Sequence, residues 1–251
     1  MVTGYYQSFE SFGLVDGPGV RSILFLTGCP FRCLFCHNPD TWILEKGMKI
    51  TPEEAFQKLY RYHTYWQDKG GATISGGEPL VQLDFLIELC KLLKKKNVHV
   101  TIDTSGANFT LEKEWLSRFD ELLKYTDLIM LDIKCIDDEI HKKLTGKGNG
   151  NVIEMFRYLD QKNFPIWIRH VLVPTITDDD TLLSKTYDFI KTLHNVQRVE
   201  VLPYHTLGIH KYELLKMPYR LEKVNPPSKE RIENANRLLH TDEFKGYLNT
   251  K

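Results

Sequence analysis

The sequence predicts an α/β protein built on parallel strands. Apolar segments of strand length alternate with amphipathic helical segments along the chain, which is the order of β-α units. This alternation fits an open doubly wound sheet and also a full or partial barrel. Polar, reactive residues follow all six predicted strands, at the ends where functional groups of such folds gather. A curved sheet would present every end to one ligand, so we expect one continuous site on a barrel-like sheet.

Each strand is predicted from an apolar run, and the helices from capping signals and periodicity. The first helix begins at Thr51-Pro52-Glu53-Glu54, where Thr caps, Pro fits the first turn and the acids meet the positive helix end. The predicted strands cover residues 20–27, 72–75, 99–103, 127–134, 164–173 and 198–204. The further predicted helices cover about residues 82–96, 111–124, 151–162, 178–194 and 228–240.

Composition indicates an ordinary globular protein. The 251 residues are 42% hydrophobic and 26% charged, and 33 basic residues balance 33 acidic ones, so no overall field favours nucleic acid or anionic lipid. No apolar run reaches the length of a membrane helix, and residues 1–13 lack the features of a signal peptide. We therefore expect a cytoplasmic protein with no nucleic-acid or membrane partner, and a single domain over residues 1–251.

Three of the five cysteines form the pattern Cys29-x3-Cys33-x2-Cys36 directly after the first predicted strand. A loop this tight can direct three sulfurs at one inorganic cluster, and thiolates are the ligands of iron-sulfur clusters. Three ligands on a four-iron cluster leave one iron without a protein ligand. That iron is a place for a substrate, much as a catalytic zinc keeps one position free.

Other interpretations of the cysteines are a structural zinc site or a closed electron-transfer cluster with a distant fourth ligand. His37 adjoins Cys36, and adjacent side chains rarely reach one metal. Cys90 shares a helical face with leucines, which is typical of a small core residue. Cys135 follows the fourth predicted strand and is the strongest candidate for a fourth ligand. The favoured interpretation remains a cluster with one open iron.

The segment Ser75-Gly76-Gly77-Glu78-Pro79 ends the second predicted strand. Glycine allows a ligand close to the backbone, and Glu78 can accept a hydrogen bond from an ammonium group. The segment is also a common turn. Beside an open iron, it favours a ligand that carries both an amino group and a carboxylate.

The cysteine pattern, Phe35 before the last cysteine and the "GGEP" segment resemble the radical S-adenosylmethionine superfamily. Residues 8–29, 36–42 and 202–212 extend the resemblance to the glycyl radical enzyme activases, most closely those acting on pyruvate formate-lyase. The resemblance implies a partial (β/α)6 barrel with the site at the carboxyl ends of its strands. It also implies a 4Fe-4S cluster on Cys29, Cys33 and Cys36, and S-adenosylmethionine on the open iron.

The resemblance also assigns residues to the cosubstrate, a cation and the partner protein. Cosubstrate positions are Phe35, Gly76, Gly77, Glu78, Asp103, Asp132, Lys134, Arg169 and His205. A monovalent-cation site falls on Asp103, Thr104, Met130 and Asp132, and Asp16 and Asn38 fall near the glycine loop of pyruvate formate-lyase. His170 should point away from the side of Arg169. A flavodoxin or ferredoxin is the implied electron donor.

Alternatives remain open within and outside this family. Another glycyl radical enzyme is one alternative partner, and a small metabolite is an alternative substrate. Outside enzymes, the chain would be a zinc-stabilised binding module or an iron-sulfur electron carrier. A carrier does not need polar residues at five further strand ends, so the enzyme is the favoured hypothesis.

Overall fold

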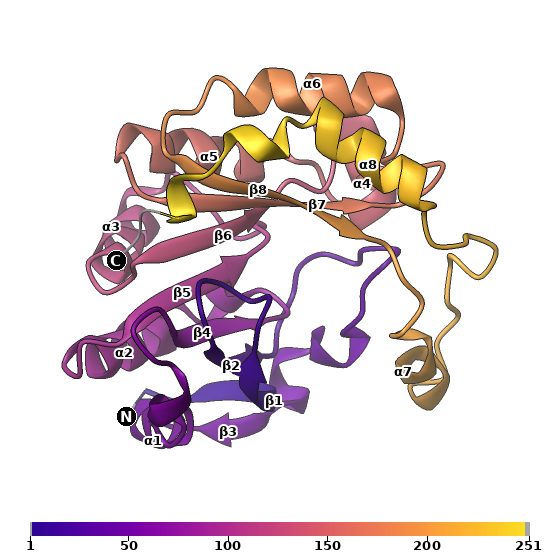
Figure 1. Cartoon of the computed structure of the whole chain (residues 1–251). Coiled ribbons are helices and arrows are strands. Elements are labelled where there is room, and N and C mark those ends of the chain that lie inside the picture. Colours follow the sequence, from indigo (N-terminus) through magenta and orange to yellow (C-terminus); the bar gives the residue numbers. More distant parts are fainter. Residues whose placement is uncertain (1, 249–251) are drawn as a thin grey trace. The chain divides into compact units, whose positions relative to one another are not determined.

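The computed structural model describes residues 2–248, in which strands and helices alternate (Figure 1). The strands are β1 (Gly4–Gly13), β2 (Arg21–Leu26), β3 (Met48–Ile50), β4 (Gly71–Gly76), β5 (His99–Thr104), β6 (Leu128–Asp132), β7 (Ile166–Leu172) and β8 (Val196–Pro203). The α-helices are α1 (Pro52–Tyr60), α2 (Leu83–Lys94), α3 (Lys113–Leu123), α4 (Asp138–Thr145), α5 (Gly150–Gln161), α6 (Asp180–Ile190), α7 (Ile209–Leu214) and α8 (Lys229–Leu238).

The strands follow the order β3-β1-β2-β4-β5-β6-β7-β8 in one sheet whose ends do not pair with each other. β2 pairs with β4, β4 with β5 and β7 with β8 in parallel. β1 runs antiparallel to both β2 and β3. The predicted α/β class is therefore confirmed, and the unclosed, mostly parallel sheet is that of a partial barrel.

All six predicted strands are present, as β2 and β4 to β8. The sequence pattern does not predict β1 or β3, because β1 mixes aromatic and polar residues that are mostly half-exposed and β3 has three residues. It also misses α4 and α7, which have eight and six residues and are too short for a clear helical period.

Contacts divide the chain into two compact units. Unit 1 comprises residues 2–30 and 40–130, and unit 2 comprises residues 31–39 and 131–248, within the part of the chain that the structure describes. The division falls inside β6 and inside the cysteine loop, so Cys29 belongs to unit 1 whereas Cys33 and Cys36 belong to unit 2. A single domain over residues 1–251 stays a prediction.

The core of unit 1 consists of β2, β4 and β5 with α2. Leu24, Ile74 and Ile102 are fully buried, as are Leu86 and Leu89 on α2. Strands buried on both faces favour apolar runs, and residues 23–26 of β2 form one, whereas β4 and β5 also bury Thr73 and Thr101. At α1, the Thr51 side chain and Glu54 form the expected capping box.

The charged side chain of Arg21 is fully buried in unit 1. Arg21, at the start of β2, donates from Nε to Thr73 Oγ1 at 3.0 Å and from Nη2 to Thr101 Oγ1 at 2.9 Å. It also donates to the carbonyl of Pro18 at 3.2 Å. Burial lowers the pKa of Arg21 to about 9. The guanidinium thus joins the amino ends of β2, β4 and β5 and anchors the loop before β2.

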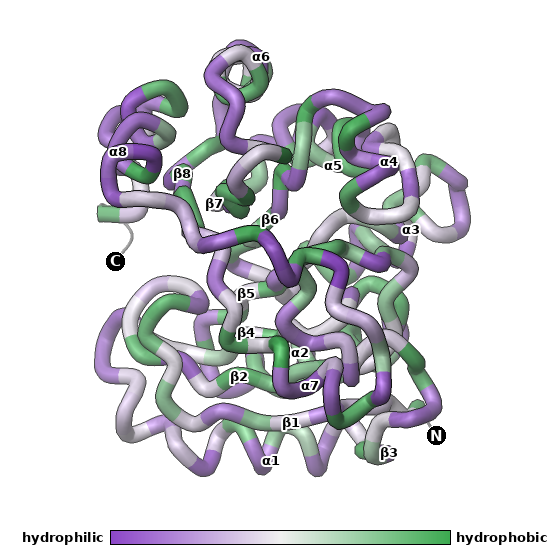
Figure 2. The backbone as a smooth tube through the Cα atoms, turned by 90° about the vertical axis from the view of Figure 1, so that its right-hand side faces the viewer, coloured by the Kyte–Doolittle hydropathy of each residue, from purple (hydrophilic) through white to green (hydrophobic). Residues whose placement is uncertain are grey.

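The core of unit 2 lies between β7, β8 and the helices α5, α6 and α8. Leu159 on α5, Ile168 on β7 and Leu183 on α6 are fully buried. Figure 2 shows both hydrophobic and hydrophilic segments along α6 and α8, as expected of helices with only one face in a core. Among the described residues, none of the helices has the length and apolar character needed to cross a membrane.

Candidate functional site

Unit 1 holds the first cysteine of the loop by its backbone. Gly28 donates to the carbonyl of Thr41 at 2.7 Å, and Cys29 donates to that of Trp42 at 3.2 Å. A side chain at Gly77 would place its Cβ 2.6 Å from Gly28 O and 3.1 Å from Cys29 Cβ, so only glycine fits. The glycine segment after β4 therefore lies directly against the first cysteine, as the sequence suggested.

In unit 2, the end of α4 holds the first half of residues 31–39. Arg32 donates its backbone N–H to the carbonyl of Thr145 at 2.7 Å, and Leu34 donates to that of Leu144 at 2.9 Å. The last carbonyls of a helix have no partner within the helix, so they are free to accept these bonds. The α4 C-terminus thus supports the loop on both sides of Cys33.

Residues 205–212 hold the second half of the same loop. The hydroxyl of Tyr212 donates to the carbonyl of Cys36 at 3.0 Å. The rings of His37 and His205 stack with centroids 3.8 Å apart, and Lys211 Nζ donates to Asn38 Oδ1 at 2.7 Å. Cys36, His37 and Asn38 therefore each contact this segment.

The cysteine environments support the predicted core role of Cys90. None of the five cysteines forms a disulfide. Cys90 is fully buried on α2, as expected of a core residue. Burial raises the pKa of Cys33 to about 11 and that of Cys135 to about 11 as well, so the thiol pKa does not distinguish the predicted ligand from the other cysteine.

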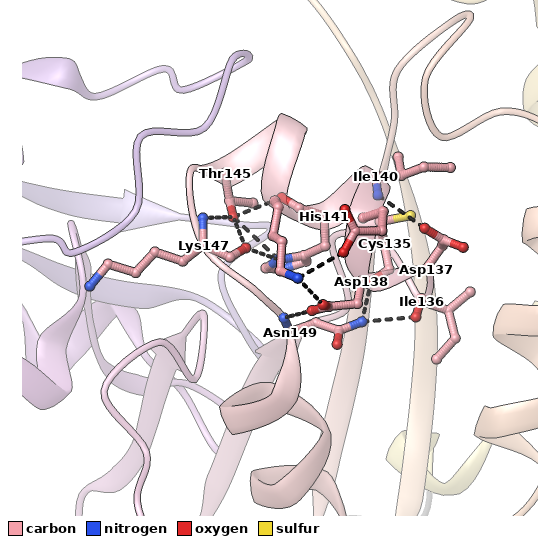
Figure 3. A network of polar contacts seen from close by, with 11 residues as sticks. Cys135, Ile136, Asp137, Asp138, Ile140, His141, Thr145, Lys147 and Asn149 are labelled. Carbon is pink, nitrogen blue, oxygen red and sulfur yellow. Dashed lines mark hydrogen bonds and ion pairs between the residues drawn. The ribbon is translucent and has the colours of Figure 1, made fainter.

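Cys135 belongs to a separate polar network, which Figure 3 shows from close by. Asn149 donates its amide to the carbonyls of Cys135 and Ile136 at 3.2 and 2.8 Å, and His141 Nδ1 lies 2.7 Å from Lys147 O. The network fixes the turns around α4, which in turn supports the cysteine loop. Sequence reasoning missed this role, although Asp137 and Gly146 are recognisable cap residues of α4.

The structure gathers no three His, Cys, Asp or Glu side chains into one metal-binding group among residues 2–248. Cys29 and the other two cysteines lie in different units, each described by itself. The three-cysteine ligand set therefore stays a prediction, supported by the donor type and by the backbone contacts that fix each part of the loop.

Glu78 is fully buried in unit 1, and hydrogen bonds fill both of its oxygens. Oε1 accepts from Thr104 Oγ1 at 2.6 Å and from Leu80 N at 3.1 Å. Oε2 accepts from the backbone N–H of Ser105 at 2.9 Å and also from its hydroxyl. A carboxylate has about four acceptor sites, and these four donors occupy them. Burial nevertheless raises the pKa of Glu78 above its usual value.

The contacts of Glu78 join the end of β4 to the end of β5. The sequence predicted Glu78 as an acceptor for an ammonium group, but it did not reveal that Thr104 and Ser105 supply the observed donors. An ammonium ligand would have to share or displace one of them. Asp103, which precedes Thr104, accepts a hydrogen bond from Ser75 Oγ at 2.6 Å. Glu78 and Asp103 therefore both connect β4 to β5.

The predicted cation ligands divide between the units. Thr104 and Met130 are buried in unit 1, where Thr104 Oγ1 donates to Glu78 and accepts from Gly106 N at 3.0 Å. Asp103 also belongs to unit 1, whereas Asp132 belongs to unit 2. The four-residue cation site stays a prediction.

Unit 2 contains a carboxylate of low exposure, Asp132, whose side chain is 14% exposed and which has cationic partners. Asp132 Oδ2 accepts from Lys134 Nζ at 2.8 Å, and Asp132 Oδ1 lies 3.5 Å from Arg169 Nε. Burial alone would raise the pKa of Asp132, but Lys134 and Arg169 outweigh it, so the pKa is lowered. Lys134 Nζ also lies 5.4 Å from the centroid of the Phe35 ring. Four predicted cosubstrate residues are thus gathered: Asp132 and Lys134 at the end of β6, Arg169 within β7, and Phe35 in the cysteine loop.

The remaining predicted residues have identifiable positions. His170 is buried, with Nδ1 2.9 Å from Ile133 O, which agrees with a structural role. Asp16 accepts from Thr73 Oγ1 through its backbone carbonyl at 2.7 Å, so its loop is fixed on β4. Asn38 is held by Lys211, as described above. A partner-binding role for Asp16 and Asn38 stays a prediction.

Residues 23–185 match the family model of the Radical SAM superfamily. The pyruvate formate-lyase-activating enzyme of Streptococcus mutans is 46% identical, over 98% of this chain and 94% of its own. That of Staphylococcus epidermidis is 49% identical, over 96% of each chain. A solved radical SAM methyltransferase from Sphaerobacter thermophilus has a TM-score of 0.65 at 17% identity, over 90% of this chain and 65% of its own, a likeness of fold alone.

Proposed function

Because the chain belongs to the radical SAM superfamily and, within it, to the family of pyruvate formate-lyase-activating enzymes, we propose that it installs a glycyl radical on pyruvate formate-lyase. The observation that carries this proposal is the likeness to named activating enzymes over nearly the whole of both chains. The cysteine loop supplies the chemistry that such an activity requires.

The family implies a 4Fe-4S cluster and S-adenosylmethionine. Cys29, Cys33 and Cys36 would hold the cluster, since they are the thiols of one short loop with both halves fixed by backbone hydrogen bonds. When bound, the cluster supplies one electron that cleaves the cosubstrate to methionine and a 5'-deoxyadenosyl radical. The residues around it have to bind, orient and protect these groups.

Each unit would contribute one part of the cosubstrate site. In unit 1, Gly77 lies beside Cys29 and Gly76 lies against Leu26, and their backbone would suit the methionine amino group. Asp103 and Glu78 fix the residues on either side, through hydrogen bonds from Ser75 and from Thr104. In unit 2, Arg169 and Lys134 hold positive charge for a carboxylate or a ribose. Phe35 offers a ring to the adenine, and His205 completes this part.

A monovalent cation would complete the site on Asp103, Thr104, Met130 and Asp132. The physical reason is charge: two aspartates beside a substrate carboxylate repel it unless a cation lies between them. The lowered pKa of Asp132 keeps this side chain ionised and therefore suited to a cation.

The macromolecular partners follow from the reaction. A glycine Cα–H is a reasonable target because no side chain blocks it and the product radical is delocalised over two amides. Asp16 and Asn38 would lie near the incoming glycine loop. A cytoplasmic flavodoxin or ferredoxin would supply the electron.

The test is an anaerobic incubation of the iron-reconstituted protein with dithionite, S-adenosylmethionine and pyruvate formate-lyase. We expect methionine and 5'-deoxyadenosine together with a gain in lyase activity. Cleavage of the cosubstrate without any lyase activity would favour another glycyl radical enzyme or a small metabolite as the substrate. Absence of cleavage would contradict the proposal as a whole.

A further inference from the structure

The segment that holds the cysteine loop also forms an exposed surface, here called the α7 face. It comprises the exposed side chains of residues 206–223 together with Arg32. Leu207 and Leu214 are 76% and 79% exposed, and Leu215 beside them is also exposed. Exposed apolar side chains that gather in one patch mark a site where another molecule can bind.

The α7 face connects to the cysteine loop by direct contacts. Tyr212, on α7, donates to the carbonyl of Cys36, and Arg220 Nη2 donates to the carbonyl of Arg32 at 2.7 Å. Gly208 lies so close to His37 that an added Cβ would be 2.9 Å from His37 Cα. A protein bound on this face would therefore contact the same segment that holds Cys36 through Tyr212.

The charge of the α7 face differs from that of the whole chain. The chain is balanced, with 33 basic and 33 acidic residues. The exposed basic residues of the face are Arg32, Lys216, Arg220 and Lys223, against two exposed acidic ones, Glu213 and Glu222. Exposed leucines together with an excess of positive charge complement a partner whose contact surface is negative.

We propose that the α7 face is the docking surface for an acidic one-electron carrier protein that reduces the cluster. This inference rests on the proposed function. In the transfer, the carrier is oxidised by one electron and the cluster bound to the cysteine loop is reduced by one. A carrier must leave after each transfer, and a small interface of apolar and charged contacts suits such brief encounters.

The lyase is the other protein that has to meet this chain, but the contacts favour the carrier. An electron can enter through the loop backbone and the cluster ligands, which the α7 face touches. Hydrogen abstraction instead requires the glycine to reach the cosubstrate itself. The two possibilities can be distinguished with a chemical reductant in place of the carrier. A variant of the α7 face should then still activate the lyase if the carrier binds there, but not if the lyase does.

The test uses the double variant Lys216→Glu/Lys223→Glu, in which neither lysine has a role in the cysteine loop. The matched control is Lys95→Glu/Lys96→Glu, which reverses two exposed charges at the end of α2 in unit 1. Iron-reconstituted proteins are mixed with reduced flavodoxin, and cluster reduction is followed by stopped-flow absorbance at low and high salt. A third variant, Leu214→Ser, removes apolar contact without changing charge.

We expect the α7-face double variant to be reduced about tenfold or more slowly at low salt, because steering of a charged partner contributes at least this much to association rates. The difference should shrink at high salt, and the α2 control should match the wild type. Leu214→Ser should slow reduction at both salt concentrations. With dithionite as the reductant, all variants should cleave S-adenosylmethionine and activate the lyase like the wild type.

Equal reduction rates in the two double variants would overturn the proposal. It would also be overturned if the α7-face variant lost lyase activation under dithionite, since the face would then serve the lyase. Failure of the proposed function has a different signature, because the wild type would then not activate the lyase even with dithionite, while the reduction rates would still be measurable.

Discussion

Each of the two units buries one carboxylate near a strand end, and the two carboxylates have opposite partners. Glu78 in unit 1 accepts hydrogen bonds only from hydroxyl and backbone N–H groups, and its pKa is raised. Asp132 in unit 2 faces Lys134 and Arg169, and its pKa is lowered. The carboxylate with neutral donors joins two strands, whereas the one beside cations is held ionised.

The cysteines extend this comparison, since unit 1 supplies Cys29 and unit 2 supplies Cys33 and Cys36. If both units serve one cluster, Cys29→Ala and Cys33→Ala should each lose all of the about four irons and four sulfides of a reconstituted chain. Iron and sulfide analysis with the visible absorption spectrum measures this. Cys90→Ser and Cys135→Ser are the controls and should keep the cluster. Loss of iron in Cys135→Ser would make Cys135 a fourth ligand.

Removing the Lys134 ammonium group that pairs with Asp132 should lower the free energy of unfolding more than a change at the molecular surface does. Lys134→Met leaves Asp132 buried with only Arg169, and breaking a buried pair in this way costs about 3 kcal/mol or more. Chemical denaturation of the metal-free protein measures the free energy of unfolding. Lys142→Met is the matched control, because its ion pairs are about half-exposed and should contribute little to stability. Similar losses in both variants would contradict the assigned role of Lys134.

Glu78→Gln should have a smaller effect of about 1–3 kcal/mol, the cost of leaving one buried donor without an acceptor. The glutamine side chain places an N–H group where a carboxylate oxygen accepted a hydrogen bond, so that two donors face each other. Glu88→Gln on the exposed face of α2 is the control and should change stability little. If Glu78→Gln left the free energy of unfolding unchanged in the same experiment, the carboxylate would not be the group that joins β4 to β5.

The smallest expected effect concerns how the contribution of each carboxylate to the free energy of unfolding depends on pH. The raised pKa of Glu78 means that the folded state binds its proton more tightly than the unfolded state does. Its contribution is therefore full below the ordinary value of 4.5 and is lost as pH rises through the folded value. The lowered pKa of Asp132 gives the reverse: its contribution is present above 3.8 and is lost as pH falls through the folded value.

From pH 5 upward, the stability difference between wild type and Glu78→Gln should therefore shrink as pH rises. The difference between wild type and Asp132→Asn should stay constant over the same range. Denaturation midpoints at several pH values measure both. Parallel curves for the two variants would contradict the contrast between the carboxylates.

Much of the fold could be predicted from the sequence, because buried strands such as β2 and β6 contain continuous apolar runs, at residues 23–26 and 128–131. The cysteine loop and the glycine segment could also be recognised in the sequence, since the residues of each are close together in the chain. The partners of Glu78 were not, because Thr104 lies 26 residues further along and was assigned to a cation. The support of the loop by α4 and by Tyr212 depends on backbone carbonyls, which carry no sequence signal.

The central claim is that this chain transfers a radical to a glycine of its partner. Electron paramagnetic resonance tests it most directly, on the reduced protein mixed without oxygen with S-adenosylmethionine and pyruvate formate-lyase. We predict a doublet signal from one α-hydrogen, which collapses to a singlet when the lyase contains glycine deuterated at Cα. Cleavage of S-adenosylmethionine with no radical on the lyase would contradict the claim.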